Sequence, residues 1–123
     1  MPDLTTLLEE VKQVYSDFGG LPRGNTEELA MDLDHANAWL MRASEILAEA
    51  EALLNTKRGE RAKVYREQNI SATYLRELLT ADCVPEQKLY TLTSRLISTL
   101  THRIDSLRTL ISFEKSALQL GGQ

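Results

Sequence analysis

The chemically informative side chains of this 123-residue sequence are mainly cations, and they are concentrated in one short segment. Five fall within ten positions, with Glu60 as the only acid between them: Lys57, Arg58, Arg61, Lys63 and Arg66. If the segment is helical, five cations in ten residues occupy most of the helix circumference. One neighbouring face cannot neutralise them all, so some must meet solvent, the carboxylates of a partner, or phosphates.

An aromatic residue, Tyr65, lies inside this basic cluster. Single-stranded nucleic acid is bound by cations that neutralise phosphates and by aromatic rings that stack on unpaired bases. The sequence therefore predicts a nucleic-acid site formed by these six residues: Lys57, Arg58, Arg61, Lys63, Tyr65 and Arg66. The alternative is that the cations form intersubunit salt bridges with an acidic segment that holds Glu45, Glu49 and Glu51, and both interpretations can hold together.

Residues for catalysis, metal binding or cofactor binding are sparse. Asp32 and His35 are three apart, as two metal ligands on one helix can be, but a surface ion pair explains them better. Cys83 has no adjacent cation in the sequence to lower its pKa, which favours an inert thiol. No phosphate-binding glycine loop or nucleophile motif is present. We therefore predict a protein that is not an enzyme and uses no cofactor or metal.

Composition and charge distribution describe the kind of chain that carries the cluster. It is 42% hydrophobic and 26% charged, which fits a soluble folded protein, and it has no run of 18 apolar residues that would span a membrane. Residues 1–55 hold 11 acidic and 3 basic residues, whereas residues 56–123 hold 7 acidic and 11 basic ones. The single cysteine and the absence of a signal-peptide pattern predict a cytoplasmic location.

The periodicity predicts an all-α fold in two parts. Residues 1–24 form an N-terminal helical arm, from about residue 4 to 17, and a Gly/Pro linker. Residues 25–123 form a helical hairpin core, in which long helices over about 25–67 and 85–120 are antiparallel and joined by a short helix over about 71–81. Asp3 and Asn25 are the expected N-caps.

Both long helices carry apolar residues at coiled-coil spacing. The predicted seam consists of Leu29, Leu33, Ala36, Leu40, Ala43, Leu47, Ala50 and Leu54 on the first helix, and of Ile97, Leu100, Ile104, Leu107, Ile111 and Leu118 on the second. Further apolar residues lie off this seam: Trp39, Ile46, Leu53, Leu89, Leu92, Leu96 and Leu110. Since apolar residues on several faces need several helical partners, the pattern predicts a homo-oligomer.

In order along the chain, these features resemble the phage recombination mediators of the UvsY type. The resemblance covers roughly residues 29–115 and is carried by four segments: HANAWL at 35–40, RAKVY at 61–65, LLTAD at 78–82 and IDSLR at 104–108. It implies a small helical homo-oligomer in the cytoplasm of a bacterial host cell. That protein would bind single-stranded DNA and help load a phage recombinase onto DNA coated with a single-strand-binding protein.

By the same resemblance, Arg61 and Lys63 are the DNA-contacting pair, and Lys57, Arg58 and Arg66 either assist them or take no part. The acidic N-terminal half would then face away from DNA or face the recombinase. The alternative function is a protein-interaction module, such as a phage-encoded inhibitor or adaptor, whose acidic long helix occupies a basic groove on another protein.

Overall fold

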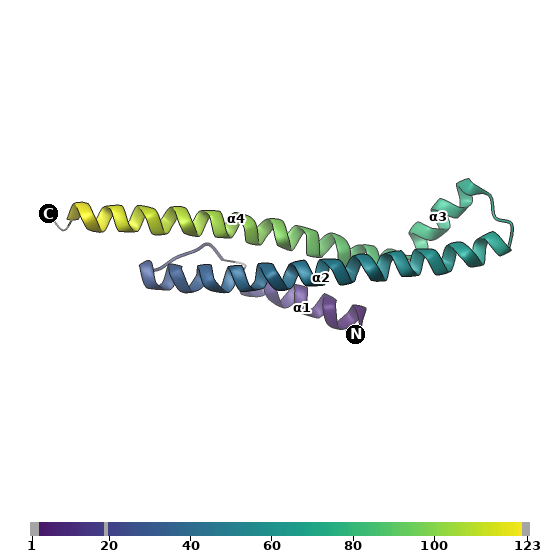
Figure 1. Ribbon diagram of the computed structural model, residues 1–123, viewed down its shortest axis with the longest axis horizontal. Coiled ribbons are helices and arrows are strands. Elements are labelled where there is room, and N and C mark those ends of the chain that lie inside the picture. The colour runs from purple at the N-terminus through teal and green to yellow at the C-terminus, as the bar shows by residue number, and fades with distance from the viewer. Residues whose placement is uncertain (1–2, 19, 122–123) are drawn as a thin grey trace.

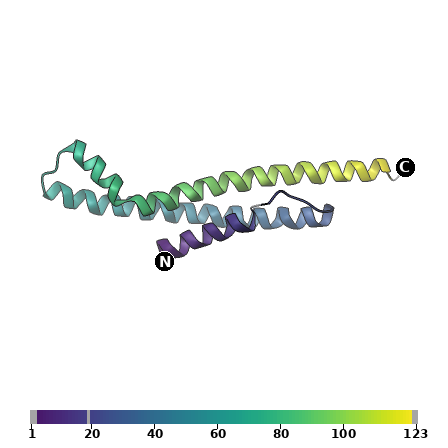
Figure 2. The same cartoon turned by 180° about the vertical axis from the view of Figure 1, so that it is seen from behind.

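A computed structural model of the chain describes residues 3–18 and 20–121. It contains four helices: α1 (Leu4–Asp17), α2 (Thr26–Glu67), α3 (Ala72–Asp82) and α4 (Val84–Gly121). The long helices α2 and α4 run antiparallel, α1 lies along them, and α3 folds back beside the end of α2 (Figures 1 and 2). The described residues contain no strand, so the predicted all-α fold is confirmed.

Local sequence signals set the helix boundaries. The Asp3 and Asn25 side chains accept hydrogen bonds from the backbone N–H groups of Thr6 and Glu28, at 2.8 and 2.9 Å, so both predicted N-caps are confirmed. α2 ends where Asn69 adopts a φ of 58°, a left-handed conformation that asparagine tolerates well. The Ile70 N–H then donates to the Tyr65 carbonyl at 3.2 Å, which reverses the chain toward α3.

The connection between α3 and α4 is tighter than the predicted turn over 82–85. Only Cys83 separates the two helices, and α4 begins at Val84. Pro85 therefore lies in the first turn of α4, where a missing backbone N–H breaks no helical hydrogen bond. This short joint fixes α3 at an angle to α4.

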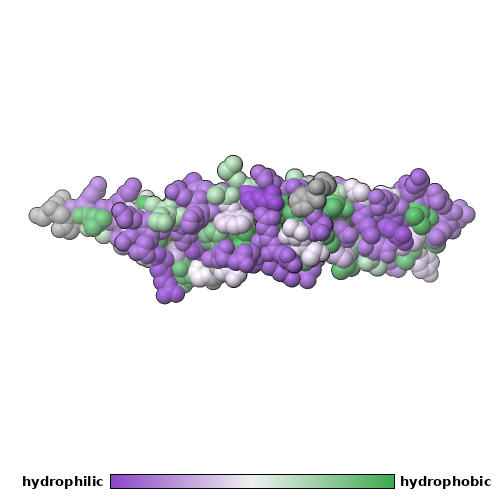
Figure 3. All heavy atoms as spheres, turned by 90° about the horizontal axis from the view of Figure 1, so that it is seen from below, coloured by the Kyte–Doolittle hydropathy of each residue, from purple (hydrophilic) through white to green (hydrophobic). Residues whose placement is uncertain are grey.

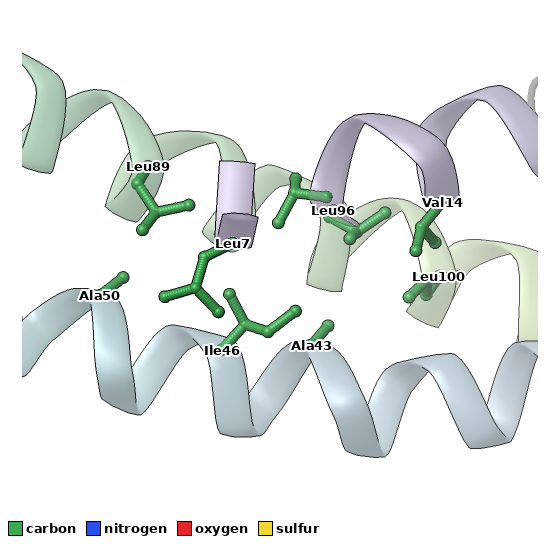
Figure 4. Close-up of a cluster of buried hydrophobic side chains, with 9 residues drawn as sticks. Leu7, Val14, Ala43, Ile46, Ala50, Leu89, Leu96 and Leu100 are labelled. Atoms are coloured by element: carbon green, nitrogen blue, oxygen red, sulfur yellow. The ribbon is translucent and has the colours of Figure 1, made fainter. Parts of the chain in front are cut away.

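The main hydrophobic core is formed by three helices rather than two. Residues from α1, α2 and α4 meet in a cluster whose side chains are at most 1% exposed: Leu7, Val11, Val14, Ala43, Ile46, Ala50, Leu89, Leu96 and Leu100 (Figure 4). The small alanines of α2 let the other two helices approach closely. A second cluster, formed by Leu29, Ala36, Ile104 and Leu107, continues the α2–α4 contact toward the C-terminal end of α4.

The arm buries residues that the sequence placed off the seam, while most of the predicted seam lies in the core. Ile46, Leu89 and Leu96 were expected off the seam, yet they are at most 1% exposed because α1 covers them. Five predicted seam residues are only half-buried: Leu33, Leu40, Leu47, Ile97 and Ile111. Apart from the terminal Leu118, the other eight are buried as expected: Leu29, Ala36, Ala43, Ala50, Leu54, Leu100, Ile104 and Leu107. Leu118 is 66% exposed, since α4 extends beyond the start of α2 (Figure 1).

This correction changes the argument for association. The apolar residues covered by α1 need no second copy of the chain, so they no longer support a homo-oligomer.

On the face shown in Figure 3, hydrophilic residues predominate and hydrophobic side chains lie between them. None of the helices in the described ranges is both long and apolar enough to cross a membrane.

Polar contacts hold the arm and linker in place. The Arg103 guanidinium, 12% exposed, donates to both Asp32 carboxylate oxygens at 2.9 and 2.6 Å, and to the carbonyls of Phe18 and Gly20. Arg42 makes a two-pronged contact with Glu10 at 2.7 and 2.9 Å. This hydrogen bonding lowers the pKa of Glu10. The arm is therefore docked on its own hairpin by both packing and charge.

Candidate nucleic-acid interface

The basic cluster occupies the end of α2 that lies beyond the arm. Leu4, where α1 begins, lines the same hollow as Leu53 and Lys57, so α2 continues without α1 from there to Glu67. Only α3 folds back against this end (Figure 1). Residues 57–82 hold six basic and four acidic residues, whereas residues 26–56 hold one basic and seven acidic residues. The two ends of α2 therefore carry opposite net charge.

Arg61 and Tyr65 form a joint with α3. Arg61 donates to Asp82 at 2.9 Å and to the Tyr65 hydroxyl at 3.1 Å, and that hydroxyl donates to the same Asp82 oxygen. The guanidinium carbon also lies 5.0 Å from the centroid of the Tyr65 ring. The hydrogen bonds from Tyr65 and Arg61 lower the pKa of Asp82, so the carboxylate stays charged.

This joint corrects two predicted roles. Tyr65 is 9% exposed and its hydroxyl is bonded to Asp82, so the ring is not presented for stacking on a base. The guanidinium of Arg61 donates to Asp82 and Tyr65, so its charge is already paired and it is a weaker phosphate ligand than the unpaired cations. Both side chains instead position α3 beside the basic end of α2. The partner that decides this, Asp82, lies 21 residues from Arg61 in the sequence.

The other four cations of the cluster remain available. Arg58, Lys63 and Arg66 are exposed and Lys57 is half-buried. Within residues 3–18 and 20–121, none of the four makes an ion pair. Within one chain Glu45 pairs with Arg42. The alternative of intersubunit salt bridges concerns a second copy of the chain and stays a prediction. Four charges are thus presented to solvent around about three turns of helix.

α3 adds two residues that the sequence analysis did not assign to the site. Arg76 lines the same hollow as Arg58, a space of about 570 Å³ between α2 and α3 with Leu75 and Leu79 among its other lining residues. Tyr74 is 65% exposed on α3, so it offers the free aromatic ring that Tyr65 does not. The helical spacing of the α3 leucines is the sequence signal that could have found both residues. It turns the leucine face toward α2, so Tyr74 and Arg76, which lie off that face, remain at the surface.

The remaining candidate groups have structural explanations. The Asp32 carboxylate is held by Arg103, so it is not free to form a metal pair with His35. Cys83 is 1% exposed, and burial raises the pKa of its thiol. Across the described ranges, no three His, Cys, Asp or Glu side chains are grouped as metal ligands would be.

Comparison with known proteins gives no independent assignment. No family model, curated protein sequence or solved structure matches this chain.

Proposed function

We propose that this chain is a non-enzymatic recombination mediator that binds single-stranded DNA as a homo-oligomer. The observation that supports this proposal is a set of four cations at one end of α2 that make no ion pair among residues 3–18 and 20–121: Lys57, Arg58, Lys63 and Arg66. Cations that release counterions from phosphates supply most sequence-independent affinity for nucleic acid. Arg76 extends the cationic surface across α3.

The geometry favours a single strand over a duplex. Tyr74 presents an exposed ring on α3, the helix that also carries Arg76, and stacking requires bases that are not already paired. Base stacking contributes about 1–3 kcal/mol per base when a ring is fully used. A flexible strand can also follow cations that are spread around a helix, which a stiff duplex does less well.

Each chain alone is expected to bind weakly. The basic end carries a net charge of only +2 over residues 57–82, and the chain as a whole is acidic with a net charge of −4. Linking several such sites in one assembly raises the overall affinity without any new contact. Weak sites that act together also release DNA segment by segment, which suits a mediator that hands DNA to a recombinase. The resemblance to UvsY-type mediators supports the same function. It also implies a single-strand-binding protein as a partner.

The test is a salt titration of binding to a fluorescently labelled oligo(dT), followed by fluorescence anisotropy. If four phosphates are neutralised per chain, log K should fall with log salt with a slope of roughly −3 per chain. The variant Lys63→Ala/Arg66→Ala should bind about tenfold more weakly and show a slope shallower by roughly 1.4 per chain. Alanine favours the helix, so helix content should not change.

A matched control removes the same charge elsewhere. Arg108 and Lys115 are exposed on α4, far along the chain from the cluster. The variant Arg108→Ala/Lys115→Ala should keep the affinity and slope of the parent. If the two double variants behave alike, the cluster is not the DNA site. If the parent does not bind at low salt, the alternative of a protein-interaction module takes the place of the mediator.

A further inference from the structure

The face of α2 that points away from α4 carries a second, exposed helical stripe. Its six residues follow a 4-3-4-3-4 spacing and are all exposed: Glu27, Met31, Asp34, Ala38, Met41 and Glu45. Met31 and Met41 are 61% and 72% exposed, unusual for large apolar side chains. Three acidic and three apolar residues thus share one exposed helix face, here called the acidic stripe.

α4 carries an exposed stripe of the opposite charge with the same spacing. Its six residues are Lys88, Leu92, Arg95, Thr99, His102 and Ser106, and all but the half-buried Leu92 are exposed. The Tyr15 hydroxyl of α1 donates to the Leu92 carbonyl at 3.2 Å, so the arm borders this stripe on one side. Between its cations lies an apolar hollow of about 450 Å³, lined by Val84, Leu92, Lys88 and Arg95 among others. Val84 is itself 57% exposed there. This face is here called the basic stripe.

We infer that the acidic stripe of one copy of this chain docks on the basic stripe of a second copy. The triplet Glu27, Met31, Asp34 and the triplet Lys88, Leu92, Arg95 have the same 4-3 spacing and opposite charge. With the two helices parallel and aligned, each acid meets a cation and Met31 enters the hollow over Leu92.

The charges in these triplets are unused within the chain. Among residues 3–18 and 20–121, Glu27, Asp34, Lys88 and Arg95 make no ion pair. In the same alignment, the small residue Ala38 lies opposite Thr99, which lets the helices approach closely. A second copy supplies the complement to each stripe, in charge and in spacing, so it is the occupant that these observations favour over an unrelated protein.

The contact joins different surfaces on its two partners, so it is head-to-tail. Such contacts propagate into closed rings or open filaments instead of stopping at a two-fold dimer. The contact identifies the interface of the homo-oligomer on which the proposed function rests. The basic end of α2 lies outside it, since 12 residues, or about 18 Å of helix, separate Glu45 from Lys57.

Charge reversal with mixing tests this interface. Two variants reverse one stripe each: Glu27→Lys/Asp34→Lys and Lys88→Glu/Arg95→Glu. In sedimentation velocity at tens of micromolar without DNA, the parent should associate and each variant alone should be monomeric. An equimolar mixture should associate again, because each variant then offers the other a complementary stripe on both faces. Recovery on mixing also shows that both variants are folded.

A matched control and a DNA measurement complete the design. Glu9→Lys/Asp105→Lys makes the same charge change at exposed positions off both stripes and should associate like the parent. A monomeric parent, or variants that stay monomeric when mixed, would overturn the inference. Oligo(dT) binding is scored separately. A parent that associates without binding DNA contradicts the proposed function and leaves this interface standing. A monomeric parent that binds DNA contradicts this interface and the homo-oligomer on which the proposed function rests, but not the DNA site.

Discussion

Two adjacent residues of α2 distinguish the observed core from the heptad seam. Ile46 is fully buried against α1 and α4, whereas Leu47 is half-buried and belongs to neither core cluster. Truncating a fully buried isoleucine to alanine costs about 2–5 kcal/mol, from lost burial and the cavity left behind. We expect about 3 kcal/mol for Ile46→Ala and roughly 1 kcal/mol or less for Leu47→Ala, whose side chain is already partly in water.

Urea unfolding followed by circular dichroism at 222 nm measures both variants. A loss of about 3 kcal/mol should also lower the melting temperature by roughly 10 °C for a chain of this size. Ile46→Val, which removes one methyl group, should cost about 1 kcal/mol and gives a readout if the alanine variant is too unstable. Equal losses at the two positions, or a larger loss for Leu47→Ala, would refute the packing of α1 against Ile46.

Three further outcomes follow from the polar contacts. Arg103→Lys should destabilise the fold by about 2 kcal/mol in urea unfolding, because an ammonium group cannot reproduce the forked contacts of the guanidinium; an unchanged midpoint would contradict this. Since Arg42 lowers the folded pKa of Glu10 below its ordinary value of 4.5, stability from this pair is complete above that value and is lost as the pH falls through the folded pKa. As the pH is lowered, the urea midpoint of the Glu10→Gln variant should therefore fall less steeply than that of the parent. Tyr65→Phe should speed hydrogen exchange of the α3 amides while leaving the amides of the main core unchanged; equal rates in parent and variant would argue against the joint.

Helix boundaries were predictable because they depend on local signals. The Asn25 side chain caps α2 by accepting a hydrogen bond from the backbone N–H three residues later. The long segment without proline that follows lets the helix continue. The position of α1 was not predictable in this way. Periodicity marks Leu7, Val11 and Val14 as apolar, but it does not say which helices they cover, so Ile46 and Leu89 were assigned to the wrong surface.

The residues of the candidate site also differ in how far the sequence alone could assign them. Cation density alone located the basic end of α2, and exposure of Arg58, Lys63 and Arg66 agrees with that location. The individual roles of Arg61 and Tyr65 depended on Asp82, which the fold brings from the end of α3. A pairing between distant residues leaves no local pattern, so sequence spacing gave no reason to remove these two from the site.

Photo-crosslinking is the direct test of whether single-stranded DNA lies along the basic end of α2. Gly59 is exposed between the cations, and a Cβ atom added there would meet nothing within 4 Å, so the helix has room for a side chain to start. A benzophenone amino acid in place of Gly59 should form an adduct with labelled oligo(dT) on irradiation, and the same group in place of the exposed Ser112 on α4 should not. The yield of adduct should fall with rising salt, in parallel with the affinity for oligo(dT). Equal adduct yields at the two positions, or an adduct only at position 112, would contradict the account.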